Sequence, residues 1–118
     1  AVSIRPFIGA QDFELSRSFY KALGWEETAL GPDMSVFKTQ NIAFYLQKAY
    51  VKDWVDNTML FVEVGDVEQY WEELNALGLP EKFKGAKLAP IRYEDWGSEC
   101  FLHDPSGILW HFGQFSKK

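Results

Sequence analysis

The side chains best suited to nucleophilic or acid–base chemistry near neutral pH are few: one cysteine, Cys100, and two histidines, His103 and His111. Residues 104–107 have the sequence DPSG, and Asp, Pro and Gly stand at the positions that a type I turn favours. A hairpin closed by this turn sets Cys100 opposite His111 if its loop has an even length, whereas a bulge sets Phe101 there. Because buried single cysteines are usually inert, a Cys–His dyad is the less favoured arrangement.

Three roles are open for His111, which lies in the last expected strand. It could form a structural hydrogen bond, contact a ligand, or act as a general base. His103 lies beside the turn and is expected near solvent. Glu63 places a charge within an otherwise apolar strand. Since an unpaired buried carboxylate is costly, we expect Glu63 either to face a wet cleft or to pair with a cation such as Arg5.

An internal repeat supplies the elements that position these side chains. Residues 7–24 and 61–78 match at a constant offset of 54 residues. Six of the eighteen positions are identical, where average residue usage gives roughly one. The identical pairs are Phe7/Phe61, Asp12/Asp66, Glu14/Glu68, Ala22/Ala76, Leu23/Leu77 and Gly24/Gly78. Helix capping explains the Asp and Gly pairs but not the equal spacing, so the repeat favours two copies of one small unit around a shared cleft.

Each copy is predicted to form a strand, a helix and three further strands. Asp12 and Asp66 are the expected helix N-caps, and a glycine ends each helix. Strands are expected in the first copy over 3–10, 25–30, 34–39 and 41–47, and in the second over 58–64, within 81–93, and over 98–103 and 108–115. Residues 48–57 are expected to be a connecting loop. Pro90 predicts an edge strand or a bulge.

Composition excludes some partners. The chain has 118 residues and a formal net charge of −5, which argues against nucleic acid and anionic membranes. A cationic small molecule is weakly compatible with this charge, but ordinary solubility is the favoured explanation. The single cysteine excludes an internal disulfide, and the sequence has neither an apolar run of about 18 residues nor a visible signal peptide. We therefore expect a cytoplasmic protein without a membrane partner.

Three segments resemble the vicinal-oxygen-chelate superfamily, which includes glyoxalase I, extradiol dioxygenases, fosfomycin-modifying thiol transferases and bleomycin-resistance proteins. The segments are DFELSRSFYKALGW from Asp12, NTMLFVEV from Asn57 and WGSECFLHDPSGILWHF from Trp96. The last segment is the most specific, and it is similar to the bleomycin-binding branch in particular. The resemblance implies an α+β fold with two tandem βαβββ modules, about 1–50 and about 54–118, in a single domain over 1–118. Their sheets would curl around a cleft.

The resemblance also implies four positions where metal-dependent members place their ligands. Mapped through the repeat, these positions hold Arg5, Tyr45, Met59 and His111. Divalent metals at such sites prefer several imidazoles or carboxylates, whereas arginine stays protonated and a thioether is a soft ligand. Only His111 is a usual ligand, so we predict that the chain has no metal site and no cofactor.

If the four mapped positions face the cleft, strand alternation brings further side chains to it. The predicted ligand-binding residues are Arg5, Tyr45, Gln47, Trp54, Met59, Phe61, Glu63, Trp96 and His111. For Phe7 and Phe61, packing in the core is favoured over contact with a ligand, and Trp110 and Phe112 fall on the opposite strand face. Such a wall of apolar groups with sparse polar groups is typical of small-molecule pockets. The tryptophans expected in loops, Trp54 and Trp96, could meet either a ligand or a second subunit.

The resemblance therefore favours a metal-free protein of the bleomycin-resistance type. It would sequester an aromatic compound, which could also be cationic, in a cleft of a homodimer, and no residue is assigned a catalytic role. In that family the first strand is often exchanged between subunits, and the sequence leaves this open here. The alternatives are an enzyme, either metal-dependent or a metal-free isomerase, lyase or thiol transferase using His111, and a dimeric scaffold without a small-molecule partner.

Overall fold

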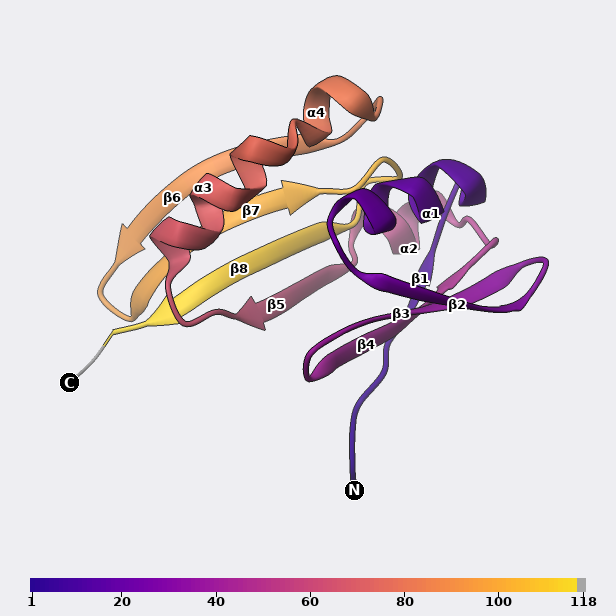
Figure 1. Ribbon diagram of the computed structural model, residues 1–118, viewed down its shortest axis with the longest axis horizontal. Helices are drawn as coiled ribbons and strands as arrows, with labels where there is room; N and C mark the ends of the chain where they lie inside the picture. Colours follow the sequence, from indigo (N-terminus) through magenta and orange to yellow (C-terminus); the bar gives the residue numbers. More distant parts are fainter. Residues whose placement is uncertain (117–118) are drawn as a thin grey trace.

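The computed structural model describes residues 1–116, so the last two positions of the predicted second module, 117–118, lie outside the described residues. The chain is an α+β protein with two consecutive βαβββ modules, as the sequence predicts (Figure 1). Module 1 contains β1 (Phe7–Gly9), α1 (Phe13–Ala22), β2 (Glu26–Gly31), β3 (Met34–Thr39) and β4 (Ile42–Gln47). Module 2 contains β5 (Met59–Glu63), α3 (Val67–Leu77), β6 (Lys87–Glu94), β7 (Gly97–His103) and β8 (Leu109–Phe115).

The repeated aspartates and glycines bound the two long helices. The Asp12 carboxylate accepts a hydrogen bond from the Leu15 backbone N–H at 3.1 Å, and the Asp66 carboxylate accepts the equivalent bond at 3.1 Å. Beyond the helices, Gly24 has φ +101° and Gly78 has φ +63°, a region in which a side chain is strained. The capping prediction is therefore confirmed at both ends of both helices.

Each module folds its strands into a four-stranded sheet with the same order. The orders are β1-β4-β3-β2 and β5-β8-β7-β6, with the first strand parallel to the last in each module. The register pairs Phe7 with Tyr45 in module 1 and Phe61 with His111 in module 2. The internal repeat thus places these two pairs at equivalent positions, and they become the centres of two open sheet faces.

Two local predictions need correction, and one short helix is additional to the predicted elements. The first strand is shorter than expected, because residues 1–6 precede β1, and Pro6 has no N–H with which to extend a ladder. The expected loop 48–57 contains a short helix, α2 (Lys52–Asp56), supported by a Lys52–Asp56 ion pair at 2.6 Å. A further short helix, α4 (Leu79–Lys82), follows Gly78 directly. The predicted irregularity at Pro90 is present, since the β6–β7 register shifts between Ala89 and Arg92.

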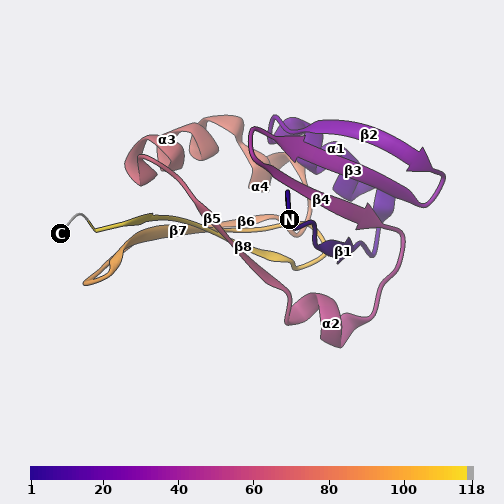
Figure 2. The same cartoon turned by 90° about the horizontal axis from the view of Figure 1, so that it is seen from below.

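One face of each sheet is covered by a helix. In Figures 1 and 2, α1 lies against the sheet of module 1 and α3 against the sheet of module 2. The covered faces hold the core, which is continuous across both modules and includes Phe37 and Phe44 from one and Trp110 and Phe112 from the other. Trp110 and Phe112 are buried on the face predicted for them.

The DPSG turn joins the modules through a buried polar network. The Asp104 carboxylate accepts a hydrogen bond from the Tyr20 hydroxyl of α1 at 2.6 Å and three bonds from the backbone N–H groups of residues 106–108, each at 2.9 Å. The Trp110 indole donates to the same Tyr20 oxygen at 3.0 Å. Burial raises the pKa of Tyr20 well above its ordinary value, which keeps the phenol protonated as a donor. We call this network the module joint.

Candidate functional site

The uncovered face of each sheet carries the residues predicted to bind ligand. Strand alternation directs Tyr45 and Gln47 of β4 away from α1, and it directs Phe61 and His111 of the second sheet away from α3. Large apolar side chains are exposed on these faces, including Phe7, Met59, Phe61 and Phe115. Exposed aromatic clusters of this kind mark ligand-binding or protein-interaction surfaces.

On the open face of module 1, three side chains form one small cluster. The rings of Phe7 and Tyr45 stack with centroids 4.7 Å apart at an angle of 23°. The Arg5 guanidinium donates a hydrogen bond to the Tyr45 hydroxyl at 3.3 Å and lies 6.0 Å from its ring centroid. Phe7 is therefore not core filler but part of an exposed stack, and Arg5 is a cation at its edge.

On the open face of module 2, Phe61 is the centre of a larger aromatic cluster. Its ring centroid lies 5.5 Å from Phe115, 6.0 Å from Trp96 and 6.3 Å from the His111 ring. Gly113 makes this placement possible, because a Cβ there would lie 2.4 Å from the Phe61 ring. Despite these contacts Phe61 remains 44% exposed, so much of its ring is available to a ligand or a partner.

A carboxylate orients the imidazole of His111. Glu99 Oε1 lies 2.8 Å from His111 Nδ1, and both side chains are largely shielded. The carboxylate can only accept, so Nδ1 donates and Nε2 of the neutral ring is left as an acceptor or base. Sequence reasoning missed Glu99, although its spacing of two from Phe101 on the same strand places both on one face.

The register settles the question of what faces His111. Phe101 pairs with His111, while Cys100 pairs with Phe112 on the core side. The Cys100 thiol is buried, and burial raises its pKa to about 11, so the reactive thiolate is disfavoured. The Cys–His dyad is thereby excluded, and the alternative with Phe101 opposite the histidine is the one the fold adopts.

The structure also decides between the two environments predicted for Glu63. Its side chain is exposed on the open face of module 2, and within residues 1–116 no ion pair joins it to Arg5. The Glu63 carboxylate is therefore solvated by water and is not paired with a cation of the described chain, so it carries no cost of burial. Of the remaining predicted residues, Met59 is 63% exposed at the start of β5 and Trp54 is 74% exposed on α2.

The predicted site residues form two groups and not one enclosed pocket within a single chain. Tyr45 belongs with Arg5 and Phe7, whereas His111 belongs with Phe61 and Trp96. Among the residues described, no hydrogen bond or ring contact links the groups. The four mapped ligand positions are therefore divided between two sheets, and Arg5, Tyr45, Met59 and His111 are chemically unsuited to a divalent metal. Over 1–116, no cluster of three His, Cys, Asp or Glu residues could hold one.

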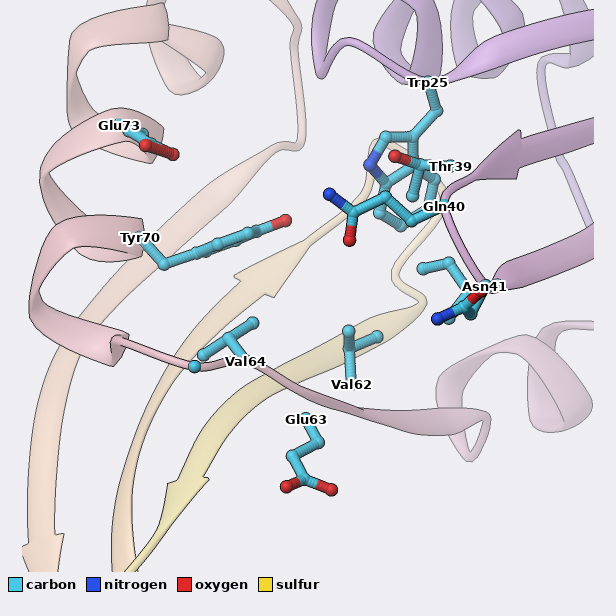
Figure 3. A pocket seen from close by; sticks show the side chains of 11 residues that line it. Trp25, Thr39, Gln40, Asn41, Val62, Glu63, Val64, Tyr70 and Glu73 are labelled. Carbon is cyan, nitrogen blue, oxygen red and sulfur yellow. The ribbon is translucent and has the colours of Figure 1, made fainter.

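Of the cavities where the modules meet, two lie beside β5. One of about 150 Å³ touches Phe61 and is mostly apolar, with residues of β4, β5 and the N-terminal segment together with Asn41 and Trp110. The other, of about 370 Å³, lies between the β3–β4 turn and α3 (Figure 3). Sequence reasoning missed both cavities because they depend on how the modules pack and on no motif.

Within the described residues, none of the helices is long and apolar enough to span a bilayer.

Comparisons with solved structures define the fold. The chain superposes on a bleomycin resistance determinant encoded on the transposon Tn5 with a TM-score of 0.84 and 15% identity, covering 99% of this chain and 100% of that one. A bleomycin-binding protein from bleomycin-producing Streptomyces verticillus, complexed with copper(II)-bleomycin, gives 0.80 and 22% identity over 98% of each chain. A lactoylglutathione lyase from Agrobacterium tumefaciens gives 0.73 and 16% identity, covering 97% and 94%.

These likenesses show that the chain has the fold shared by the bleomycin resistance determinant, the bleomycin-binding protein and the lactoylglutathione lyase. The resemblance predicted from the sequence is thus confirmed at the level of fold. No protein-family model matches the chain, and no curated protein matches it. What the fold does in this chain must therefore be argued from its own side chains.

Proposed function

We propose that this chain is a metal-free binding protein of the bleomycin-resistance type, which sequesters a flat aromatic compound. The exposed cluster around Phe61 is the observation that carries the proposal. Its rings offer apolar area for stacking, and the Glu99–His111 pair and Glu63 add sparse polar groups that could fix a ligand's orientation. A cationic ligand is favoured over an anionic one, because these two carboxylates lie on the same open face.

We further propose that the binding site is completed in a homodimer. Each chain exposes two half-sites, the Tyr45 cluster and the Phe61 cluster, which supports a cleft with one wall from each subunit. Additional apolar surface is exposed in the N-terminal segment, where Val2 and Ile4 are almost fully accessible. This segment extends away from the body of the molecule in Figure 1. A partner subunit would cover this segment and remove the apolar surface from water. A cytoplasmic location belongs to the same proposal.

The residues at the four mapped metal-ligand positions support binding without metal chemistry. Arg5 and Met59 stand at two of the four mapped positions, and neither is a ligand for a divalent ion of borderline or hard character. Any metal carried by the ligand itself would be cargo and would not need protein ligands. The neighbour complexed with copper(II)-bleomycin is a precedent for that situation in the same fold.

Bleomycin is the first probe to test this function. We expect metal-free and copper(II)-loaded bleomycin to quench the fluorescence of Trp96, while light scattering reports a dimer. Phe61→Ala should weaken binding by about tenfold or more, as expected for a central aromatic contact. Trp71→Phe, a change on α3, is the matched control and should leave the quenching intact. A monomer that shows no quenching with bleomycin or with planar aromatic amines would refute the proposal.

The second candidate is a metal-free enzyme that uses His111 as a general base. The Glu99–His111 hydrogen bond favours it, because a carboxylate on Nδ1 leaves Nε2 free to take a proton. Exchange of a carbon-bound proton next to a carbonyl, followed by NMR in D₂O, tests this chemistry. His111→Gln should abolish exchange and Glu99→Gln should reduce it, whereas no exchange above buffer with the unaltered protein would remove this candidate.

A further inference from the structure

The cavity of about 370 Å³ between the modules has walls of a different chemistry from the open sheet faces. Module 1 contributes Trp25 and the β3–β4 turn, and module 2 contributes the end of β5 and the exposed side of α3. A neighbouring cavity of about 180 Å³ shares four of its residues and extends it between the helices. The shared residues are Trp25, Thr39, Tyr70 and Glu73. The two cavities therefore form one continuous groove at the module boundary.

Trp25 has a largely buried ring, but its indole nitrogen, which has no partner within residues 1–116, is open to the cavity. The side chain is 6% exposed, and its ring stacks on Tyr20 and contacts Trp110. The Trp110 indole donates to Tyr20, but within residues 1–116 the Trp25 indole donates to nothing. Figure 3 shows its nitrogen directed into the cavity. Because no fully buried side-chain nitrogen or oxygen within residues 1–116 lacks a partner, this nitrogen is open to solvent in the cavity, where it can donate to an acceptor on a ligand.

Other polar groups converge on the same space. Figure 3 shows the Tyr70 hydroxyl and the Gln40 amide directed toward it from opposite modules. Burial raises the pKa of Tyr70 to about 12, so its hydroxyl remains a neutral donor and acceptor at physiological pH. The side chains of Val62 and Val64 form an apolar floor, while the Glu63 side chain points to the opposite face of β5. The cavity thus combines an apolar base with hydrogen-bonding groups around its sides.

The electrostatics of the cavity favour a cation. Glu73 lines it, and no lysine or arginine is among the residues that do. The Glu73 carboxylate has only one long hydrogen bond within the described chain, from Gln69 at 3.5 Å, so it keeps free acceptor capacity. The Tyr70 phenol on the same helix and the Trp25 indole across the cavity add aromatic surface, an arrangement that suits ammonium and amidinium groups.

We propose that this groove is a second ligand site, separate from the open sheet faces, which binds a small aromatic compound with a cationic amine or amidine group. The cation pairs with Glu73, an acceptor on the ligand takes the Trp25 indole N–H, and the ring lies over Val62 and Val64. The site is independent of the proposed dimer cleft, because its polar residues lie on the helix-covered side of the molecule.

Gln40 adds an argument from backbone conformation. Among the described residues it is the one non-glycine position with positive φ, at +46°. Glycine or asparagine adopts this conformation at lower cost, so glutamine makes the fold less stable here than glycine would. Its presence indicates that its side chain has a role. We therefore expect Gln40→Gly to preserve or raise the melting temperature while it weakens ligand binding. A variant with weaker binding and no loss of stability cannot be explained by misfolding.

The test uses the indole N–H signals of the full ¹⁵N-labelled chain, which has five tryptophans. Trp25→Phe identifies the Trp25 signal, and tyramine and benzamidine are the probes. We expect both probes to shift this signal, 4-ethylphenol to bind more weakly, and 4-hydroxyphenylacetate not to bind. Glu73→Gln should weaken amine binding about fivefold to tenfold, the loss expected for one partly exposed charged hydrogen bond. Glu72→Gln, on the same helix and outside the cavity, should have no effect.

The proposals for the two sites can be refuted separately. No shift of the Trp25 signal with either cationic probe would overturn the second site and leave the bleomycin test untouched. A shift confined to the Trp54 or Trp96 signals would assign the probes to the open faces and would likewise overturn it. Equal loss of binding in Glu73→Gln and Glu72→Gln would show that overall charge, and not a built site, attracts the amines.

Discussion

The two modules follow the same chain path but present different chemistry at equivalent positions. In module 1 the parallel pair is Phe7 and Tyr45, stacked at 4.7 Å with an arginine at its edge. In module 2 it is Phe61 and His111, 6.3 Å apart within a larger aromatic cluster and beside a carboxylate. The shared positions come from the repeat, whereas the side chains have diverged into one cationic wall and one acidic aromatic wall. The repeated fold thus presents two unlike open faces.

The interiors of the modules differ as well. Module 1 anchors its helix with an ion pair, in which Glu27 accepts from Arg17 at 3.1 Å and also from the Ser35 hydroxyl at 2.7 Å. Module 2 instead sends the Asp104 turn into module 1 and thereby fixes the boundary between them. Each carboxylate is mostly buried and hydrogen-bonded, so each should contribute to stability far more than an exposed charge does. These differences can be tested by matched substitutions in the two modules.

The largest effect is expected at the module joint. Asp104→Ala removes the acceptor of four hydrogen bonds and leaves three backbone N–H groups and the Tyr20 hydroxyl without a partner. We expect a loss of about 3–5 kcal/mol in the free energy of unfolding, measured by urea denaturation. Asn41→Ala alters the corresponding turn of module 1, which is exposed, and should change stability by less than about 0.5 kcal/mol. Similar losses in both variants would contradict the assigned joint.

The helix anchor of module 1 should give the next largest effect, and it should depend on pH. Hydrogen bonding to Arg17 lowers the pKa of Glu27 from 4.5 to about 2. A lowered folded-state pKa means that the stabilisation is complete above about pH 4.5 and is lost as the pH falls toward 2. Glu27→Gln should cost about 2–3 kcal/mol at pH 7.

The pH dependence provides the control for this variant. Chemical denaturation at pH 7 and at pH 3 should show that Glu27→Gln flattens the acid-induced loss of stability. Glu26→Gln, at the adjacent exposed position, should retain the full dependence of the unaltered protein. If both variants lose stability in parallel with the unaltered chain, the pair with Arg17 does not carry the acid sensitivity.

Much of the fold, but less of the site, could be predicted from the sequence. The caps at Asp12 and Asp66 and the alternation of β4 and β8 are local signals, so the elements and the faces of Tyr45 and His111 follow from them. Glu99 could have been found by alternation once the β7 register was known. That register depends on the loop at 104–107, which left Cys100 and Phe101 as open alternatives.

Other features depend on contacts between distant segments. The buried role of Asp104 arises only when its turn meets Tyr20, 84 residues earlier in the chain. The unpaired indole of Trp25 likewise follows from how the β3–β4 turn and α3 leave a cavity between them. Short helices such as α2 carry too few residues for a clear periodic pattern, which is why that segment is predicted as a loop.

A glycine in module 2 offers a sharper test of the difference between the open faces. Gly113→Ala places a Cβ against the Phe61 ring at 2.4 Å, so the ring must move out of its cluster. We expect a cost of about 1–2 kcal/mol, together with a change in Trp96 fluorescence, because overpacking displaces neighbouring rings. Gln47→Ala is the counterpart in module 1 and should be nearly neutral. Adding Phe61→Leu should recover much of the loss, and failure of this rescue would show that the clash lies elsewhere.

The smallest effect on stability is expected at Arg5, where a change in function should outweigh it. Its interactions with Tyr45 are exposed, so Arg5→Gln should alter the free energy of unfolding by at most about 0.5 kcal/mol. If the Tyr45 cluster forms one wall of the proposed dimer cleft, removing this cation changes bleomycin affinity while the fold stays intact. Lys38→Gln, on the same sheet and away from the stack, controls for net charge. Equal affinity in both variants would leave Phe61 and His111 as the whole of the site, which would make the two modules functionally unequal.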